Sequence, residues 1–323
     1  MNLPITVIIP FSNLNNKEIQ NTLDSLFKQN RLPNELIIVL TKKKVNFNNL
    51  YKKKISKLGV KVKIIYKKNA YPGLARNIGI INSKNSYIAF LDHKTVPPRE
   101  WLFHGFKKLK QDKSEIILGQ TLYFSKNLKD EIMISSTVGK KLLETLPGTI
   151  LKKNIFLKSG MFIENVRSGE DGDWFRRLKT HNIKLNKNKF NLTYLFSGIS
   201  IHNLFKKWYL YYKASANLDQ LQLHKQIYLL SMLTFLMLFI YNWNFIFADW
   251  DQNSKIYIHH ITKRSVLYMS ILYVFLRGIL MPVKKGVKLN FLLPINFLFI
   301  SCLSLCLDLI KTWCYITSYF KKK

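Results

Sequence analysis

The chain has 323 residues, of which 48% are hydrophobic and 14% aromatic, a composition too apolar for an intrinsically disordered protein. Its 51 lysines and arginines against 18 aspartates and glutamates give a formal net charge of +33, which suggests a nucleic acid or an anionic surface as partner. Most of the basic residues are lysine, whereas nucleic-acid readers use the planar fork of arginine, so the charge favours an anionic lipid surface.

Apolar runs of strand length alternate with helical patterns over the first 225 residues, which is typical of a layered α/β domain. The runs that read as strands are residues 5–10, 35–40, 60–66, 87–92, 115–124 and 191–196. Between the first two strands, residues 16–29 carry apolar side chains at helical spacing. We expect a lysine-rich helix between the second and third strands.

Polar residues that directly follow the predicted strands are the first candidates for a site, because open α/β sheets bind ligands at the carboxyl ends of their strands. After the third strand, Pro72 and Gly73 turn the chain into a helix that carries Arg76 and Asn77. A helix N-terminus with an arginine suits a phosphate group, and a capped structural turn explains the same residues. The fourth strand ends at Asp92, where a carboxylate suits either a hard divalent cation or a helix cap.

Three acids stand at the start of a further predicted helix: Glu170, Asp171 and Asp173. Capping and the helix dipole account for one or two of them, and a general base requires such a carboxylate. Arg176 and Arg177 follow one turn later and are placed to hold one acid ionised. His202, before an aromatic helix, is a competent metal ligand or phosphate contact, with an ordinary buried histidine as the alternative.

The composition changes after residue 225, with long hydrophobic stretches at residues 227–247, 265–283 and 289–309. Each approaches the roughly 20 apolar residues that cross a bilayer core of about 30 Å. We therefore expect a domain over residues 1–225 and a membrane region with two to three helices over residues 226–323, with a buried hairpin of core helices as the alternative. All three cysteines lie there without ligand spacing, which excludes a disulfide framework and a zinc site.

The flanking charges predict how these stretches cross the membrane. No secretory signal precedes the first strand, so we expect a multi-pass membrane protein whose first domain is cytoplasmic. Lysines before the first stretch and between the second and third agree with the positive-inside rule. Three full crossings would place the lysines at 321–323 outside, so the third stretch either crosses, is re-entrant or lies along the interface.

Taken in order, these motifs resemble those of the family-two glycosyltransferases, which have the GT-A fold. The matching segments are "ITVIIPFSN", "PGLARNIGI", "SYIAFLD", "GEDGDWFRRL" and "IHNLFKKWYLYYKAS", and the resemblance covers about residues 4–216. It implies a Rossmann-like α/β domain that moves a sugar from a nucleotide-sugar donor to a hydroxyl acceptor with inversion. The membrane stretches and the basic charge suggest a lipid-linked or polysaccharide acceptor in cell-surface polysaccharide biosynthesis, with membrane lipids and no nucleic acid as further partners.

The resemblance also implies roles for the residues singled out above. Asp171 would be the general base, supported by Glu170 and Asp173. Asp92 would hold Mg²⁺ or Mn²⁺ on the diphosphate, with His202 as a further ligand. The implied contacts to the donor are Pro10, Phe11, Gly73, Arg76, Asn77 and Lys94.

Two departures from the family pattern motivate a second hypothesis. Leu40 and Thr41 stand where an acidic pair usually reads the nucleotide base, and Lys94 replaces the second acid of the DxD motif. A catalytically impaired GT-A scaffold in a surface-polysaccharide complex is therefore the main alternative. A basic nucleic-acid binder at the membrane is the third hypothesis, and its sign would be steep salt dependence of DNA retention.

Overall fold

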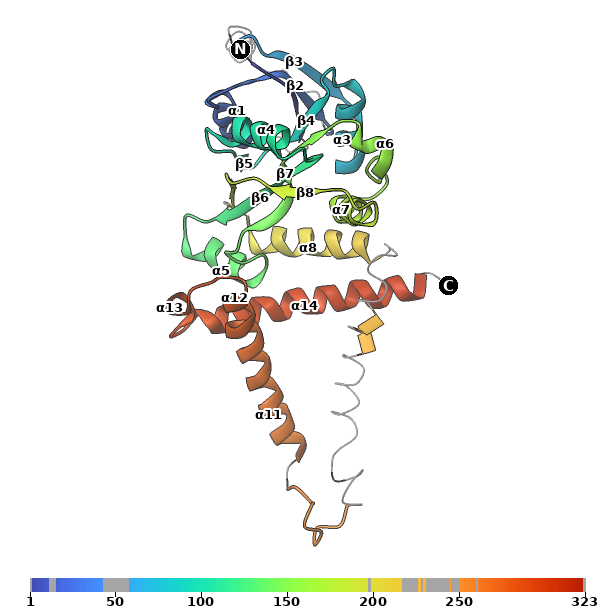
Figure 1. Cartoon of the computed structure of the whole chain (residues 1–323). Helices are drawn as coiled ribbons and strands as arrows, with labels where there is room; N and C mark the ends of the chain where they lie inside the picture. The colour runs from blue at the N-terminus through green and yellow to red at the C-terminus, as the bar shows by residue number, and fades with distance from the viewer. Residues whose placement is uncertain are drawn as a thin grey trace. The chain divides into compact units, whose positions relative to one another are not determined.

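The computed structural model describes residues 2–11, 16–42, 58–196, 199–216, 226–227, 229–230, 244, 250–259 and 261–321. By their internal contacts the residues form two compact units, one of residues 1–126 and 142–198 and one of residues 127–141 and 199–323. We call them the sheet unit and the helical unit (Figure 1). The expected domain boundary at residue 225 stays a prediction, because residues 217–225 are outside the described part.

The sheet unit is built on nine strands in the order β3-β2-β1-β4-β7-β6-β9-β5, with β8 beside β6. Their bounds are β1 Leu3–Phe11, β2 Pro33–Leu40, β3 Lys61–Tyr66, β4 Tyr87–Phe90, β5 Thr95–Val96, β6 Ile116–Phe124, β7 Leu143–Lys152, β8 Leu185–Lys187 and β9 Leu192–Leu195. β3, β2, β1 and β4 are parallel, and β7 pairs antiparallel with both β4 and β6. The carboxyl ends of the four parallel strands therefore share one edge.

Helices cover both faces of this sheet, which is why its central strands are continuously apolar. They are α1 Asn16–Phe27, α3 Pro72–Asn82, α4 Trp101–Gln111, α6 Ile155–Ser159 and α7 Glu170–Thr180. Along β1, Val7 and Ile9 join the core that α1 and α4 cover, while Ile8 joins the core under α3, α6 and α7. This period of two follows from the pleat of the strand, and both faces exclude water.

Most expected elements of this unit are present at nearly their predicted bounds. The six predicted strands correspond to β1, β2, β3, β4, β6 and β9, and the first predicted helix ends at Phe27. The lysine-rich helix expected before β3 falls on residues 43–57, outside the described part. β7 was not predicted, because Pro147 and Gly148 interrupt its pattern, and β5 and β8 have only two and three residues.

The helical unit contains α5 Leu128–Ser136, α8 Ile201–Ser215, α11 Ile261–Val274, the π-helix η2 Phe275–Leu280, α12 Met281–Lys284, α13 Leu289–Leu292 and α14 Asn296–Lys321. Its described helices include two that are long and apolar enough to cross a membrane, at Leu267–Lys284 and Asn296–Ser318. The first matches the second predicted stretch. The stretch predicted at 227–247 lies mostly outside the described residues.

The third hydrophobic stretch, predicted at 289–309, is divided in the structure. α13 ends at Leu292 and α14 begins at Asn296, so the long helix starts later and runs further than expected. Pro294 explains the break, because proline has no N–H to donate and disfavours helical dihedrals in the residue before it.

Candidate active site

The candidate residues of the sheet unit meet at the shared carboxyl edge of the parallel strands. Ile8 of β1 is paired with Phe90 of β4, so Pro10 is level with Asp92. The ring of Phe11 lies 5.7 Å from that of His93, edge to face. Phe11 is nevertheless buried in the core, so its expected place in an open base pocket stays a prediction.

Arg76 is the centre of the site. Its guanidinium donates to Glu170 Oε1 at 2.6 Å and to Asp92 Oδ1 at 3.2 Å, and it lies 6.0 Å from the ring centroid of Phe162. Arg76 is buried, as is Glu170, whereas the Asp92 side chain is 32% exposed. One side chain therefore joins three separately predicted motifs: helix α3, the end of β4 and the start of α7.

The charges in this cluster depend on one another. Burial disfavours the charged guanidinium, but the carboxylates of Asp92, Glu170 and Asp171 more than offset it and raise the pKa of Arg76 above its ordinary value. Burial also raises the pKa of Glu170, with Arg76 opposing the shift and the negative charge of Asp171 adding to it. The buried pair thus favours a positive Arg76 and makes the charge on Glu170 costly.

Of the three acids that begin α7, Asp171 is the least buried. Glu170 and Asp173 are buried, and each is engaged by arginine, whereas Asp171 is partly exposed. Asp171 Oδ1 accepts the backbone N–H of Gly172 at 2.8 Å. Its place in the first turn of α7 puts it at the positive end of the helix dipole, which stabilises an ionised carboxylate.

Asp173 holds the start of α7 to the preceding loop. It accepts from Arg177 Nε at 2.8 Å and from Arg176 at 3.4 Å, as the sequence predicted for one of the acids. Arg177 in turn donates to the carbonyls of Ser159 and Met161. These contacts give Asp173 a positioning role, and its expected support of catalysis stays a prediction.

Asn77 and Gly73 fix helix α3 against the segment that carries Phe162. The Asn77 amide donates to the Phe162 carbonyl and to Glu164 Oε1, both at 2.9 Å, and accepts the Phe162 N–H at 3.0 Å. A Cβ on Gly73 would lie 2.0 Å from the Ile163 carbonyl oxygen, so only glycine fits there. Both residues position Arg76, and their direct contact with a nucleotide stays a prediction. No sequence motif pointed to Phe162, because its role depends on tertiary contact.

The residues expected to hold a metal ion do not form a cluster in the described part of the chain. Asp92 is already paired with Arg76, and Lys94 stands two residues on. His202 lies in α8 of the helical unit, where it is exposed. Among the described residues no group of three potential ligands occurs. Because Asp92 already pairs with Arg76 and Lys94 replaces the second acid, these side chains offer a divalent cation too few oxygen ligands and fit the metal poorly.

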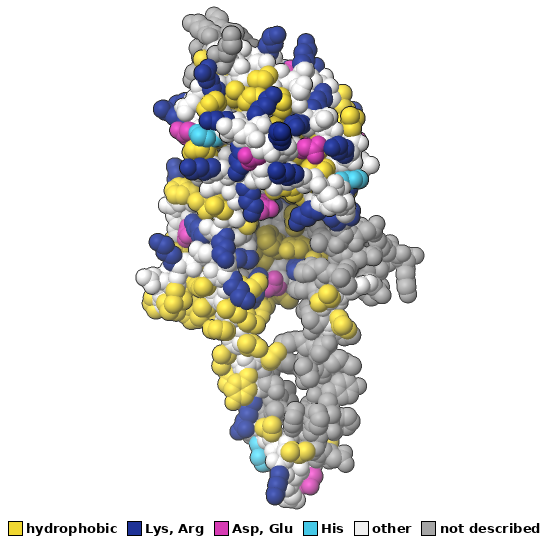
Figure 2. Space-filling view, in the orientation of Figure 1, with side chains coloured by type: hydrophobic (Ala, Val, Ile, Leu, Met, Phe, Trp, Pro, Cys, Tyr) yellow, Lys and Arg dark blue, Asp and Glu magenta, His cyan; other side chains and the backbone are white. Residues whose placement is uncertain are grey.

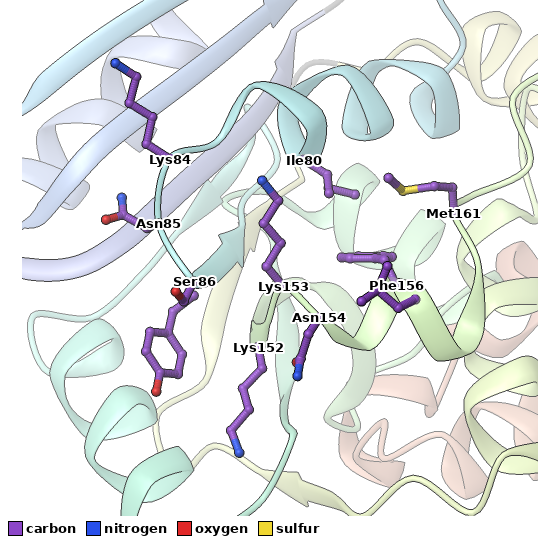
Figure 3. Close-up of a pocket in the computed structure, with 11 residues that line it drawn as sticks. Ile80, Lys84, Asn85, Ser86, Lys152, Lys153, Asn154, Phe156 and Met161 are labelled. Carbon is purple, nitrogen blue, oxygen red and sulfur yellow. The ribbon is translucent and has the colours of Figure 1, made fainter.

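A separate cavity of about 650 Å³ opens at the opposite edge of the sheet (Figure 3). Tyr87, which begins β4, and Lys152, which ends β7, belong to its lining. The lining includes Lys84 and Lys153 beside the apolar side chain of Phe156, and no acid. This cavity is therefore distinct from the Arg76 cluster and offers no general base.

Comparisons with known proteins identify the family. The sequence profile of Glycosyl transferase family 2 matches residues 6–170, which include Arg76, Asp92 and Glu170. Uncharacterized glycosyltransferases of Rickettsia bellii and Rickettsia conorii are 28% identical over 180 residues and 29% over 177, each covering 52% of this chain. The chain spans only 25% and 28% of the length of these relatives.

Solved structures of Staphylococcus aureus TarS are similar to this chain at TM-scores below 0.5. One covers 98% of this chain and 55% of its own, with 16% identity and a TM-score of 0.44. TarS 1–349 in complex with UDP-GlcNAc covers 100% and 93%, with 16% identity and a TM-score of 0.45. The predicted GT-A type of mixed α/β fold is confirmed by the family match together with the observed sheet. The chain belongs to glycosyl transferase family 2.

Proposed function

We propose that this protein transfers a sugar from a nucleotide-sugar donor to an acceptor hydroxyl, with inversion at the anomeric carbon. The observation that carries the proposal is the arrangement at the start of α7. The partly exposed Asp171 adjoins the buried Arg76–Glu170 pair, at the sheet edge where family-two proteins are expected to bind the donor.

Asp171 acts as the general base of a single displacement. The acceptor oxygen forms a bond to the anomeric carbon while the bond from that carbon to the diphosphate oxygen breaks, and its electron pair leaves with the nucleoside diphosphate. Asp171 takes the hydroxyl proton as the new bond forms. Glu170 and Asp173 are positioning residues, because each is buried and held by arginine.

The leaving diphosphate is stabilised by positive charge at the end of β4. Lys94, two residues after Asp92, stands where the family pattern has a second acid. Its ammonium group supplies part of the positive charge that a metal ion bound by that acid would otherwise provide. The resemblance adds Pro10, Gly73 and Asn77 as donor contacts, of which Gly73 and Asn77 would act by holding α3 and Arg76 in place. Since the side chains fit a divalent cation poorly, no step depends on one, and Mg²⁺ or Mn²⁺ dependence is a matter for experiment.

The acceptor is lipid-linked or a polysaccharide, and the catalytic part is anchored at the cytoplasmic face of the membrane. Two observations support this part of the proposal. The helical unit carries two helices long and apolar enough to span a bilayer. Lysine and arginine side chains are also spread over the sheet-unit face seen in Figure 2, which suits an anionic lipid surface.

A non-catalytic scaffold is the second candidate, and the end of β2 favours it. Leu40 and Thr41 are both buried there, so no carboxylate is available to read a nucleotide base. Lys94 adds to this argument, since it removes an acid that the family pattern contains. The scaffold predicts that no nucleotide binds.

A thermal-shift panel separates the two candidates. Full-length protein in detergent is melted with UDP, GDP, dTDP or CMP, each with Mn²⁺ or EDTA. A ligand at a hundred times its dissociation constant adds about 2.7 kcal/mol to the stability of the folded state. A rise in melting temperature with one nucleotide supports the transferase. If that rise disappears in EDTA, nucleotide binding depends on the metal. If no nucleotide raises the melting temperature of protein that melts cooperatively, the scaffold is favoured.

Asp171→Asn then tests the base with any donor that the panel identifies. Turnover should fall by about 10²-fold or more, while the nucleotide shift is kept. Asp251→Asn is the matched control, because Asp251 also accepts a nearby backbone N–H, from Asn253 at 2.9 Å. Turnover equal to wild type in Asp171→Asn would remove this residue from the mechanism.

A further inference from the structure

Helix α14 of the helical unit has an apolar outer face and an inner face that mixes apolar and hydroxyl side chains. Its outward side chains recur every three or four residues and are Leu298, Cys302, Leu305, Leu309, Trp313 and Ile316, of which Trp313 is 61% exposed. Its buried face combines the hydroxyls of Ser301, Ser304 and Thr312 with the apolar side chains of Ile300 and Leu307. A helix exposed to water would carry polar side chains on its outer face, so lipid or protein covers the outer stripe.

The inner face of α14 packs against charged helices. Cys314 Sγ lies 3.7 Å from the Tyr209 carbonyl of α8, and the rings of Tyr315 and Tyr212 lie 5.9 Å apart. On the same helix α8, Lys206 and Lys207 are exposed. If α14 crossed the bilayer, α8 would enter the hydrocarbon beside it with these lysines, which is unfavourable.

A second helix, α5, packs near the beginning of α14. Ile132 of α5 packs against the small apolar cluster that contains Ile300 of α14. The first turn of α5 carries Asp130 and Glu131, so this neighbour is also charged. Both helices that cover the inner face of α14 therefore belong in water or at the headgroup level.

The other candidate span meets α14 only at one end. Gly278 of η2 approaches α14 so closely that a Cβ would lie 2.6 Å from the Phe297 carbonyl, and Arg277 pairs with Asp308 at 2.8 Å. Earlier residues on α11, such as Leu267 and Tyr268, are exposed, and Figure 1 shows α11 extending away from α14. Two packed spans would instead touch along their lengths.

We propose that α14 lies in the plane of the membrane as an interfacial helix, with its apolar stripe facing lipid, while Leu267–Lys284 and the hydrophobic stretch predicted from the sequence at residues 227–247 cross the bilayer, so that α8 and α14 stay on the same side. The inference builds on the membrane association proposed above. In this placement, lipid covers the apolar stripe of α14, and α5 and α8 lie on the aqueous side of that helix. It also removes the conflict with the positive-inside rule, because the lysines after α14 then stay on the side of α8.

Depth measurements along the stripe test this placement. The full chain is prepared with its three cysteines replaced by alanine, and single cysteines at positions 298, 302, 309 and 316 carry a nitroxide spin label. In phosphatidylglycerol-containing vesicles, power saturation with oxygen and a nickel chelate reports the depth of each label. A label on Thr312→Cys is the inner-face control.

An in-plane helix gives the same depth at all four outer positions and little access to oxygen at position 312. A span gives a different profile, since positions 298 and 316 are roughly 27 Å apart along the helix axis, close to the core thickness. Shallow ends with a deep position 309 would therefore overturn the inference. The inference would also be overturned if the labels had no access to lipid and their spectra showed spin–spin broadening. That result would mean that a second copy of the protein covers the stripe.

Vesicle flotation of the same samples separates this inference from the proposed function. Protein that floats with a span-like profile contradicts only the in-plane placement of α14. Protein that does not float contradicts the proposed membrane anchoring as well. The nucleotide panel remains independent of both results.

Discussion

Replacing Arg76 tests whether the buried pair holds the site together. In Arg76→Met, Glu170 loses its partner while buried, and at pH 7 it escapes the charge by taking up a proton. Starting from its ordinary pKa of 4.5, protonation at pH 7 costs about 1.36 kcal/mol for each of 2.5 pH units, or roughly 3.4 kcal/mol. Because the pKa of Glu170 is already raised in wild type, this is the upper bound on the loss caused by the mutation, and for a domain of this size the melting temperature falls by at most about 7–14 °C.

The sign of the pH effect makes this prediction specific. At pH 5, protonating Glu170 costs less than about 1 kcal/mol. The stability that Arg76→Met loses relative to wild type should therefore shrink as the pH falls. The double variant Arg76→Met/Glu170→Gln should recover most of the loss, because no charge is left to bury. Melting is followed by near-ultraviolet circular dichroism in detergent at both pH values.

An exposed ion pair supplies the control for this experiment. Lys158 lies 2.8 Å from Glu115 and is 57% exposed, so Lys158→Met should cost about 0–1 kcal/mol at either pH. A deficit in Arg76→Met that is equally small, or one that the double variant does not relieve, would refute the assignment of Arg76 and Glu170 as a coupled pair.

Two further predictions concern the same region. In wild type the pKa of Glu170 is raised above its ordinary value of 4.5. The stability that protonated Glu170 contributes is therefore fully present below pH 4.5 and is lost as the pH rises through the pKa of the folded state. Over that pH range, melting curves should show wild type losing stability relative to Glu170→Gln. Gly73→Ala should destabilise by about 1–3 kcal/mol because of the Ile163 carbonyl, whereas Gly172→Ala, with open space at its Cβ, should not. Equal melting temperatures for the two alanine variants would contradict the close approach.

The parallel half of the sheet was predictable, and the antiparallel half less so. β1 and β2 each contain a run of four or more apolar residues because helices cover both faces, and such runs are recognisable without tertiary information. β7 contains Pro147 and Gly148, which read as a turn, yet its register against β6 shifts there and the strand continues. Only the contact between the strands reveals this.

The site residues were found as separate motifs, but their contacts were not. Arg76, Asp92 and Glu170 were each singled out by position, and no local pattern indicated that one guanidinium would join the two acids. The difference among the acids of α7 did have a signal. Glu170 shares a helix face with the buried Trp174 and Leu178, while Asp171 is one residue away from that face and remains partly exposed.

The chain enters the helical unit twice, once for α5 and again after residue 198. α5 stands between β6 and β7 in sequence, yet its Ile132 completes an apolar cluster with Val287 and Ile300. Truncation before α8 would therefore leave α5 without the side chains it packs against. On the membrane association proposed above, folding of the sheet and integration of the later helices are coupled steps of one assembly process, and we expect that removing residues 199–323 would not release an independently stable enzyme.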